Sequence, residues 1–124
     1  MPIVKVNVLK GLSSAEKKEI HDAIHQSLVS ALKIEDWDYF HRLYEFSKED
    51  FIFPESKSDR FILIEIHLFS GRTKEQKANL YKILCDSLEN IGIPRMDIFI
   101  QVLDPPLENW GIRGGLPASD IFNK

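Results

Sequence analysis

The chain has 124 residues, of which 44% are hydrophobic and 28% are charged, a size and balance typical of one globular domain. Its net charge of −3 argues against nucleic acid as the main partner, because phosphate binding depends on concentrated lysine and arginine. No run approaches the ~18 apolar residues of a membrane span, no signal-peptide pattern opens the chain, and the single cysteine excludes an intrachain disulfide. A cytoplasmic location is therefore expected.

Proline occupies position 2, directly before a run of alternating apolar residues that predicts a strand up to Leu9. If Met1 is removed, the new terminus is the secondary amine of Pro2. An α-amino group titrates near pH ~7.7–8.0, and burial in an apolar pocket lowers that value. A base with a pKa near neutrality suits proton transfer. Pro2 is therefore a candidate general base, and a purely structural residue at the start of a strand is the alternative.

A helix is predicted after this strand. Ser13 and Glu16 have the spacing of a capping box, and apolar residues then recur every four positions from Ile20 to Leu32. His21 and His25 stand four residues apart, as metal ligands on a helix can.

Each of these histidines directly follows an apolar position, however, and no third ligand is evident. We therefore expect both at the edge of the polar face rather than in a metal site.

The segment after this helix is acidic and contains Asp36 and Asp38, which could form a solvated turn or contribute a carboxylate to a site. A second strand is predicted at 40–46, and Arg42 lies on it. The polar connector 48–60 includes an apolar run at 51–53, which could add a short strand or cover an edge.

The same order of elements recurs with an offset of sixty residues, which predicts an internal duplication. The strand-like run 3–9 matches 63–69, and the second helix pattern, like the first, begins with a capping box. Cys85 falls at an apolar position of this second helix and is expected in the core rather than as a nucleophile. Matched pairs include Gly11 and Gly71, Ser13 and Thr73, Ile20 and Leu80, and Leu28 and Leu88.

A last strand is predicted at 97–103, which completes two β-α-β units, the pseudo-repeats 2–46 and 61–103. Right-handed crossovers make the strands of each unit parallel. We therefore expect one α/β (α+β) domain over residues 1–124, with a four-stranded mixed sheet and two helices on one face. The C-terminal arm 104–124 carries apolar residues among glycines and prolines, so it needs a partner surface, and a neighbouring subunit is a candidate.

Three features together resemble the tautomerase superfamily: Pro2 before a strand, the sixty-residue duplication, and the helix start from Arg72 to Lys77. With Asn109-Trp110-Gly111 in the arm, the chain looks most similar to the malonate semialdehyde decarboxylase-like group. The resemblance covers nearly the whole chain. It implies a homotrimer whose active sites lie at the amino-terminal proline near a subunit boundary, with no metal or cofactor.

The resemblance also implies roles for individual residues. Pro2 would be the general base or acid, Arg72 would hold the substrate carboxylate, and Asp38 would take part in catalysis. Trp110 would line the pocket or join subunits.

The sequence departs from the decarboxylase pattern at two positions. Ser70 stands where that group has a further arginine, and Ile112 stands where it has a phenylalanine. A serine cannot replace a bidentate carboxylate clamp, so Arg42 and Arg113 are the candidates to compensate. The residues expected to bind substrate are Arg42, Ser70, Trp110, Ile112 and Arg113.

The resemblance predicts an enzyme that moves protons on small carboxylate-bearing carbonyl compounds, by keto–enol tautomerisation of 2-oxo acids. One alternative is a decarboxylase or hydratase of a 3-oxo acid such as malonate semialdehyde. A third possibility is a noncatalytic trimeric binding scaffold that kept the fold.

Overall fold

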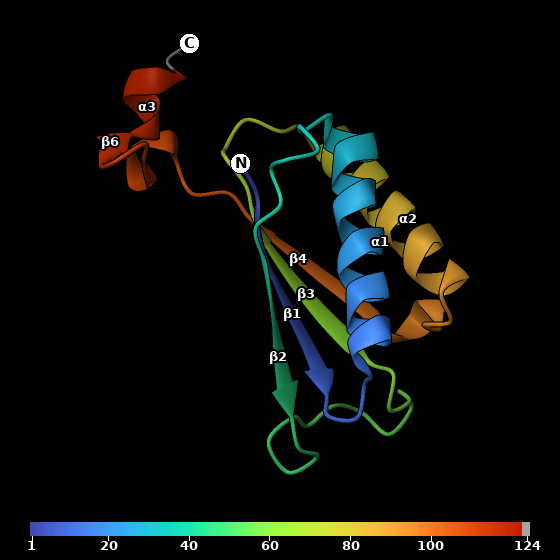
Figure 1. The fold of residues 1–124 in the computed structure, drawn as a ribbon. Coiled ribbons are helices and arrows are strands. Elements are labelled where there is room, and N and C mark those ends of the chain that lie inside the picture. Colours follow the sequence, from blue (N-terminus) through green and yellow to red (C-terminus); the bar gives the residue numbers. More distant parts are fainter. Residues whose placement is uncertain (123–124) are drawn as a thin grey trace.

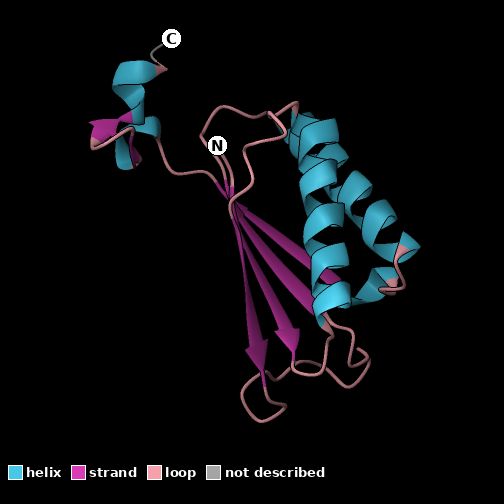
Figure 2. Ribbon diagram, viewed as in Figure 1, coloured by secondary structure: helices cyan, strands magenta, loops and turns pink. Residues whose placement is uncertain are grey.

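The computed structural model describes residues 1–122, so the last two residues of the predicted arm 104–124 lie outside the described residues. Two long helices cover one face of a mixed sheet, and the C-terminal segment extends beyond the end of the sheet where the chain begins (Figures 1 and 2). The elements are β1 (Ile3–Leu9), α1 (Ser14–Leu32), β2 (His41–Phe46), β3 (Ile62–His67), α2 (Lys74–Asn90), η1 (Arg95–Asp97), β4 (Ile98–Leu103), η2 (Leu107–Asn109), β5 (Gly111–Ile112), β6 (Leu116–Pro117) and α3 (Ala118–Ile121).

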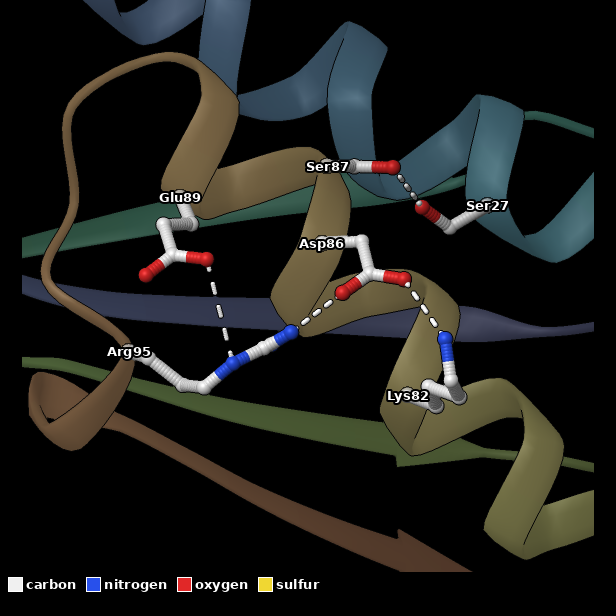
Figure 3. Close-up of polar contacts among 6 residues, drawn as sticks. All are labelled: Ser27, Lys82, Asp86, Ser87, Glu89 and Arg95. Atoms are coloured by element: carbon white, nitrogen blue, oxygen red, sulfur yellow. Dashed lines mark hydrogen bonds and ion pairs between the residues drawn. The ribbon is translucent and has the colours of Figure 1, made fainter.

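The sheet has the strand order β2-β1-β3-β4, which confirms the predicted fold class. Strands β1 and β2 are parallel, β3 and β4 are parallel, and β1 and β3 are antiparallel. Lys5 on β1 faces Glu65 on β3, its own counterpart in the duplication. Between the helices, the hydroxyls of Ser27 and Ser87 form a hydrogen bond at 3.0 Å, again sixty residues apart (Figure 3). These contacts lie where a pseudo-twofold relation between the halves places equivalent residues opposite each other.

Both helices begin as predicted. The Ser13 hydroxyl accepts the Glu16 amide and the Thr73 hydroxyl accepts the Gln76 amide, and in each case the side chain at the third position bonds back to the cap. The turns before them use Gly11 and Gly71 at φ 122° and 120°, a backbone conformation that a side chain would strain. Equivalent local chemistry therefore starts equivalent helices in the two halves.

The core lies between the helices and one face of the sheet. Strand β1 points Val4 and Val6 into it, while Lys5 and Asn7 face the opposite side. That opposite face carries exposed apolar side chains, among them Phe99 at 63% exposure. Fully buried core side chains include Val4, Val6, Ile24, Leu28, Ile62, Ile64, Ile66, Leu80, Leu84 and Leu88.

An ion-pair network links the C-terminal part of α2 to the segment that follows it (Figure 3). The Asp86 carboxylate pairs with Lys82 at 3.1 Å and with Arg95 of η1, and Arg95 also lies 3.8 Å from Glu89. Cys85 on the same helix is only partly buried, so its predicted place in the core is wrong. Burial nevertheless raises the pKa of the thiol, which disfavours the nucleophilic thiolate.

The connector between β2 and β3 forms an aromatic cluster rather than a strand. The ring of Phe51 lies 5.3 Å from that of Phe46, and Phe53 stacks on Phe61 at 4.7 Å. The connector runs at the end of the sheet opposite the N-terminus (Figure 1). Within residues 1–122, no helix combines the length and apolar character required to cross a bilayer.

Candidate active site

A cavity of about 490 Å³ lies at the N-terminus. At this end of the molecule α1 ends, α2 begins and the C-terminal arm leaves the sheet (Figure 1). Four separate segments of the chain supply the cavity wall. The lining residues are Met1, Lys33, Ile34, Glu35, Trp37, Asp38, Phe69, Arg72, Ile112, Arg113 and Phe122.

Strand β1 fixes the terminal amine at this cavity. Pro2 is buried, and the amide of Val4 donates to the carbonyl of Phe40 at 2.9 Å, which holds the start of the strand. The Met1 amine lies 3.8 Å from a carboxylate oxygen of Asp38. Burial lowers the pKa of this amine; Asp38 opposes the shift and Arg72 adds to it. Removal of Met1 would transfer the amine by one residue, onto Pro2.

Asp38 is a buried carboxylate in a turn between α1 and β2. Its amide donates to the Glu35 carbonyl at 3.1 Å, and only 8% of the residue is exposed. Burial raises the pKa of the Asp38 carboxyl, although the amine and His25 act to lower it. The neighbouring Asp36 has a side chain that is 85% exposed, so Asp38 is the aspartate that reaches the cavity. A carboxyl and an amine with perturbed pKa values in one cavity are typical of proton-transfer sites.

Arg72 lies just before the start of α2, where its guanidinium lines the cavity. One of its nitrogens donates to the carbonyl of Leu32 at 3.0 Å. Leu32 is the last residue of α1, so this bond satisfies a carbonyl that the helix leaves unpaired. The bond also orients the guanidinium and leaves most of its N–H donors for a ligand.

Arg113 brings a second guanidinium to the cavity from the arm. It lies between the short strands β5 and β6 at φ 51°, an uncommon conformation for a residue other than glycine. Its guanidinium carbon lies 5.5 Å from the centre of the Phe122 ring. Ile112, the residue before it, forms part of the apolar wall.

Four residues predicted from sequence lie outside the lining. Pro2 is one of them, because it is buried behind Met1, whose amine reaches the cavity in its place. Arg42 is exposed on the face of the sheet without helices, 5.9 Å from the Tyr44 ring centre, and Ser70 does not reach the cavity. Trp110 is buried behind the wall, where its ring meets Phe69 edge-on at 5.0 Å. It supports the wall through Phe69 rather than facing the cavity itself.

A family model described as "Tautomerase enzyme" matches residues 38–113, and a second model of the same description matches residues 2–60. The first match spans more than half of the chain. The chain belongs to the tautomerase family.

Several relatives and solved structures match nearly the whole length of this chain. It is 26% identical to the "Probable tautomerase YusQ" of Bacillus subtilis over 93% of this chain and 95% of the relative. A solved malonate semialdehyde decarboxylase aligns with a TM-score of 0.87 at 22% identity, over 96% of this chain and 95% of that one. A fused 4-OT, solved as an asymmetric trimer, aligns with a TM-score of 0.87 at 20% identity, over 98% and 99%.

Part of the cavity wall and the position of one histidine did not follow from the sequence. Trp37 and Phe69 line the cavity, and no local pattern distinguishes them from other apolar residues. His25 was expected at the edge of the polar face, but it is only 1% exposed and lies beneath the turn that holds Asp38. Helical spacing gives the direction of a side chain but not the path of the loop that covers it.

His21 points elsewhere, into a separate hollow of about 570 Å³ between α1 and β2. Its Nδ1 lies 3.1 Å from Nδ1 of His41. Among residues 1–122 there is no group of three or more His, Cys, Asp or Glu side chains suited to hold a metal ion.

Proposed function

We propose that this tautomerase catalyses keto–enol tautomerisation of small 2-oxo acids, with the amine of Pro2 as the base once Met1 is removed. The observation that carries the proposal is the place of the terminal amine, beside the buried Asp38 carboxylate in a cavity that also holds Arg72 and Arg113. No group from a cofactor is needed for a proton to move between oxygen and carbon.

The proposed step balances as a proton shuttle. The neutral amine of Pro2 accepts the hydroxyl proton of the enol, and the resulting ammonium returns a proton to C3 as the carbonyl forms. The Met1 amine has a lowered pKa because it is partly buried. The same surroundings would leave more of the Pro2 amine unprotonated at neutral pH once it becomes the terminus, which supports its role as the base. Arg72 favours the developing enolate charge.

Two arginines are available for the substrate carboxylate. Arg72 is oriented by its bond to Leu32, and Arg113 approaches from the arm. A pair of guanidiniums supports recognition of a planar carboxylate. Of the two candidates to replace the arginine absent at Ser70, Arg113 is therefore the one that the geometry favours over Arg42. The apolar wall suits the hydrocarbon or aromatic part of the same substrate.

A second candidate function is decarboxylation or hydration of a 3-oxo acid such as malonate semialdehyde. The buried carboxylate of Asp38 beside the amine favours it, because a carboxyl there could polarise a water or a carbonyl. The aligned malonate semialdehyde decarboxylase structure is described as a basis for decarboxylase and hydratase activities.

We further propose that the protein is a homotrimer. Fused 4-OT neighbours are described as trimers. The face of the sheet opposite the helices exposes apolar side chains such as Phe99, which association would cover.

Phenylenolpyruvate ketonisation, followed by ultraviolet absorbance, tests the proposed function on protein whose mass confirms loss of Met1. The wild-type protein should act well above the buffer rate, and Pro2→Ala should abolish most of the enhancement. Malonate semialdehyde is assayed beside it with Asp38→Asn. If the wild-type protein turns over malonate semialdehyde but not phenylenolpyruvate, and Asp38→Asn loses that activity, the second candidate function is correct. No turnover of either substrate would contradict both and favour a noncatalytic scaffold.

A further inference from the structure

Two side-chain contacts fix the turn that carries Asp38 to helix α1, one just before that residue in the sequence and one just after it. The contacts involve Asp36 on one side and Tyr39 on the other, and both lead to helix α1. Residues 35–39 therefore take part in both arrangements: Glu35, Trp37 and Asp38 line the cavity, whereas Asp36 and Tyr39 make the contacts with α1.

The first contact is a hydrogen bond from His25, which is almost fully buried on α1. Its Nε2 lies 2.8 Å from the carbonyl oxygen of Asp36. A carbonyl can only accept, so Nε2 must carry the hydrogen in this bond. The carboxylate of Asp36 lies 3.4 Å from the same nitrogen.

The second contact is made by Tyr39. Its ring stacks on that of His25, with centroids 3.9 Å apart and planes inclined by 16°. Its hydroxyl donates to Asp22 on α1 at 2.7 Å. Burial, together with that bond to Asp22, keeps the pKa of Tyr39 above its usual value, so the hydroxyl stays protonated and remains a donor.

General stability does not explain a histidine at position 25. Its Nδ1 is buried and has no hydrogen-bond partner among residues 1–122. An unpaired buried nitrogen is unfavourable, whereas an apolar side chain of similar size would leave no such atom. The bond from Nε2 to Asp36 is the contribution that an apolar residue could not supply.

We propose that His25 and Tyr39 are positioning residues that hold the Asp38 carboxylate against the terminal amine. This inference rests on the proposed function for its catalytic consequence, because Asp38 matters to turnover only if the amine does the chemistry. Loss of these contacts should lower kcat more than it changes KM. The groups proposed to bind the substrate carboxylate, Arg72 and Arg113, lie on other segments and should stay in place.

The test uses substitutions that separate the hydrogen bond from packing. His25→Leu removes the bond, His25→Gln offers an N–H donor of similar reach, and Tyr39→Phe removes only the hydroxyl contact with Asp22. His21→Leu is the matched control, because His21 lies on the same helix but contacts His41 instead of the turn. Circular dichroism and thermal melting establish that each variant is folded.

The first readout needs no catalysis: the pKa of Asp38, measured by carbon-13 NMR of its carboxyl group. Burial raises this pKa, and His25 acts to lower it. Release of the turn to solvent in His25→Leu should therefore bring the pKa down, whereas loss of the histidine alone should push it up. The direction of the Asp38 pKa shift therefore distinguishes release of the turn from loss of the histidine alone. Tyr39→Phe should shift it in the same downward direction, and His25→Gln should restore the wild-type value.

The second readout is steady-state ketonisation of phenylenolpyruvate, or turnover of malonate semialdehyde if that is the active substrate. A displacement of about 1 Å can lower a rate about a hundredfold. We expect kcat to fall about ten- to a hundredfold in His25→Leu with KM within about threefold, recovery in His25→Gln, and no change in His21→Leu.

An unchanged or higher Asp38 pKa in folded His25→Leu would overturn the positioning role whatever the activity. An inactive wild-type protein with the expected fall in pKa would support the positioning of Asp38 and contradict the proposed function alone.

Discussion

The site depends on two ionisable groups that the fold moves in opposite directions. Burial lowers the pKa of the terminal amine and raises that of Asp38. The two values therefore approach each other, which eases proton exchange between an acid and a base at neutral pH. Neither shift follows from local sequence, because each depends on the cavity that residues distant in the chain create.

Substitution of Arg72 and substitution of Asp38 should shift the acidic limb of the pH profile of kcat/KM in opposite directions. Arg72 lowers the pKa of the Met1 amine and Asp38 raises it, and we expect both effects to act on the Pro2 amine after Met1 is removed. Arg72→Ala should therefore shift the acidic limb of kcat/KM to higher pH, and Asp38→Asn should shift it to lower pH. Profiles of the Met1-free protein between pH 5 and 9 on phenylenolpyruvate test this, using the residual rates. Shifts of the same sign would show that the two side chains do not control the amine.

The two arginines of the cavity should set the affinity for carboxylate substrates. Loss of a charge-assisted hydrogen bond costs about 1.5–3 kcal/mol, so Arg113→Ala should raise KM about ten- to a hundredfold. Arg42→Ala, which removes an arginine from outside the cavity, is the control and should leave KM unchanged. The reverse result would assign the carboxylate to the helix-free face of the sheet, in conflict with the proposed binding mode.

The buried Asp38 carboxylate should lower the free energy of unfolding of the protein at neutral pH. Its pKa is raised in the folded protein, so above that pKa folding must bury a charged carboxylate. Asp38→Asn should therefore raise the free energy of unfolding by about 1 kcal/mol at pH 7. The difference should vanish as the pH falls through the wild-type pKa and the carboxyl becomes neutral. Urea denaturation at pH 7 and pH 3.5 measures both values, and a less stable Asn variant at pH 7 would refute this explanation.

At the scale of single elements, α1 does more than cover the sheet. It supplies the carbonyl that orients Arg72, the contacts beneath Asp38, and the pairing of His21 with His41. The amphipathic pattern predicted its core residues, and Ser13 predicted its start. The contacts of its histidines could not be predicted, because they are made to segments whose positions depend on the whole fold.

The histidine pair should make the packing of α1 on β2 sensitive to acid. Burial, helped by His21, lowers the pKa of His41 from 6.5 to about 4. Because the pKa of His41 is lower in the folded protein than in the unfolded chain, neutral His41 favours the folded state. This contribution is complete above pH ~6.5 and is lost as the pH falls towards 4. After allowance for solvent screening we expect a loss of about 1–2 kcal/mol.

Thermal melting of the wild type and of His41→Gln at pH 7.5 and 4.5 measures this loss. The wild type should lose more stability on acidification than the variant does. Equal losses would mean that His41 does not titrate in this range.

For the whole molecule, the duplication made the fold predictable. Matched turns such as Gly11 and Gly71, with matched capping boxes, indicated two β-α-β units before any contact was known. The candidate site was harder to predict from the sequence, because it lies where four segments meet. The family resemblance implied roles for Pro2, Asp38, Arg72 and Trp110 but gave no position for their side chains. The course of the arm could not be predicted, and it decides that Arg113 reaches the cavity while Trp110 supports the wall from behind.

The most direct test of the central claim compares two forms of this chain that differ only in Met1. One is the processed protein and the other is produced with methionine aminopeptidase blocked, each verified by mass spectrometry and assayed for phenylenolpyruvate ketonisation at equal concentration. A free amine on Pro2 predicts at least about a hundredfold higher kcat/KM for the processed form. Equal rates in the two forms would contradict the account, because Pro2 has no ionisable amine while Met1 is attached.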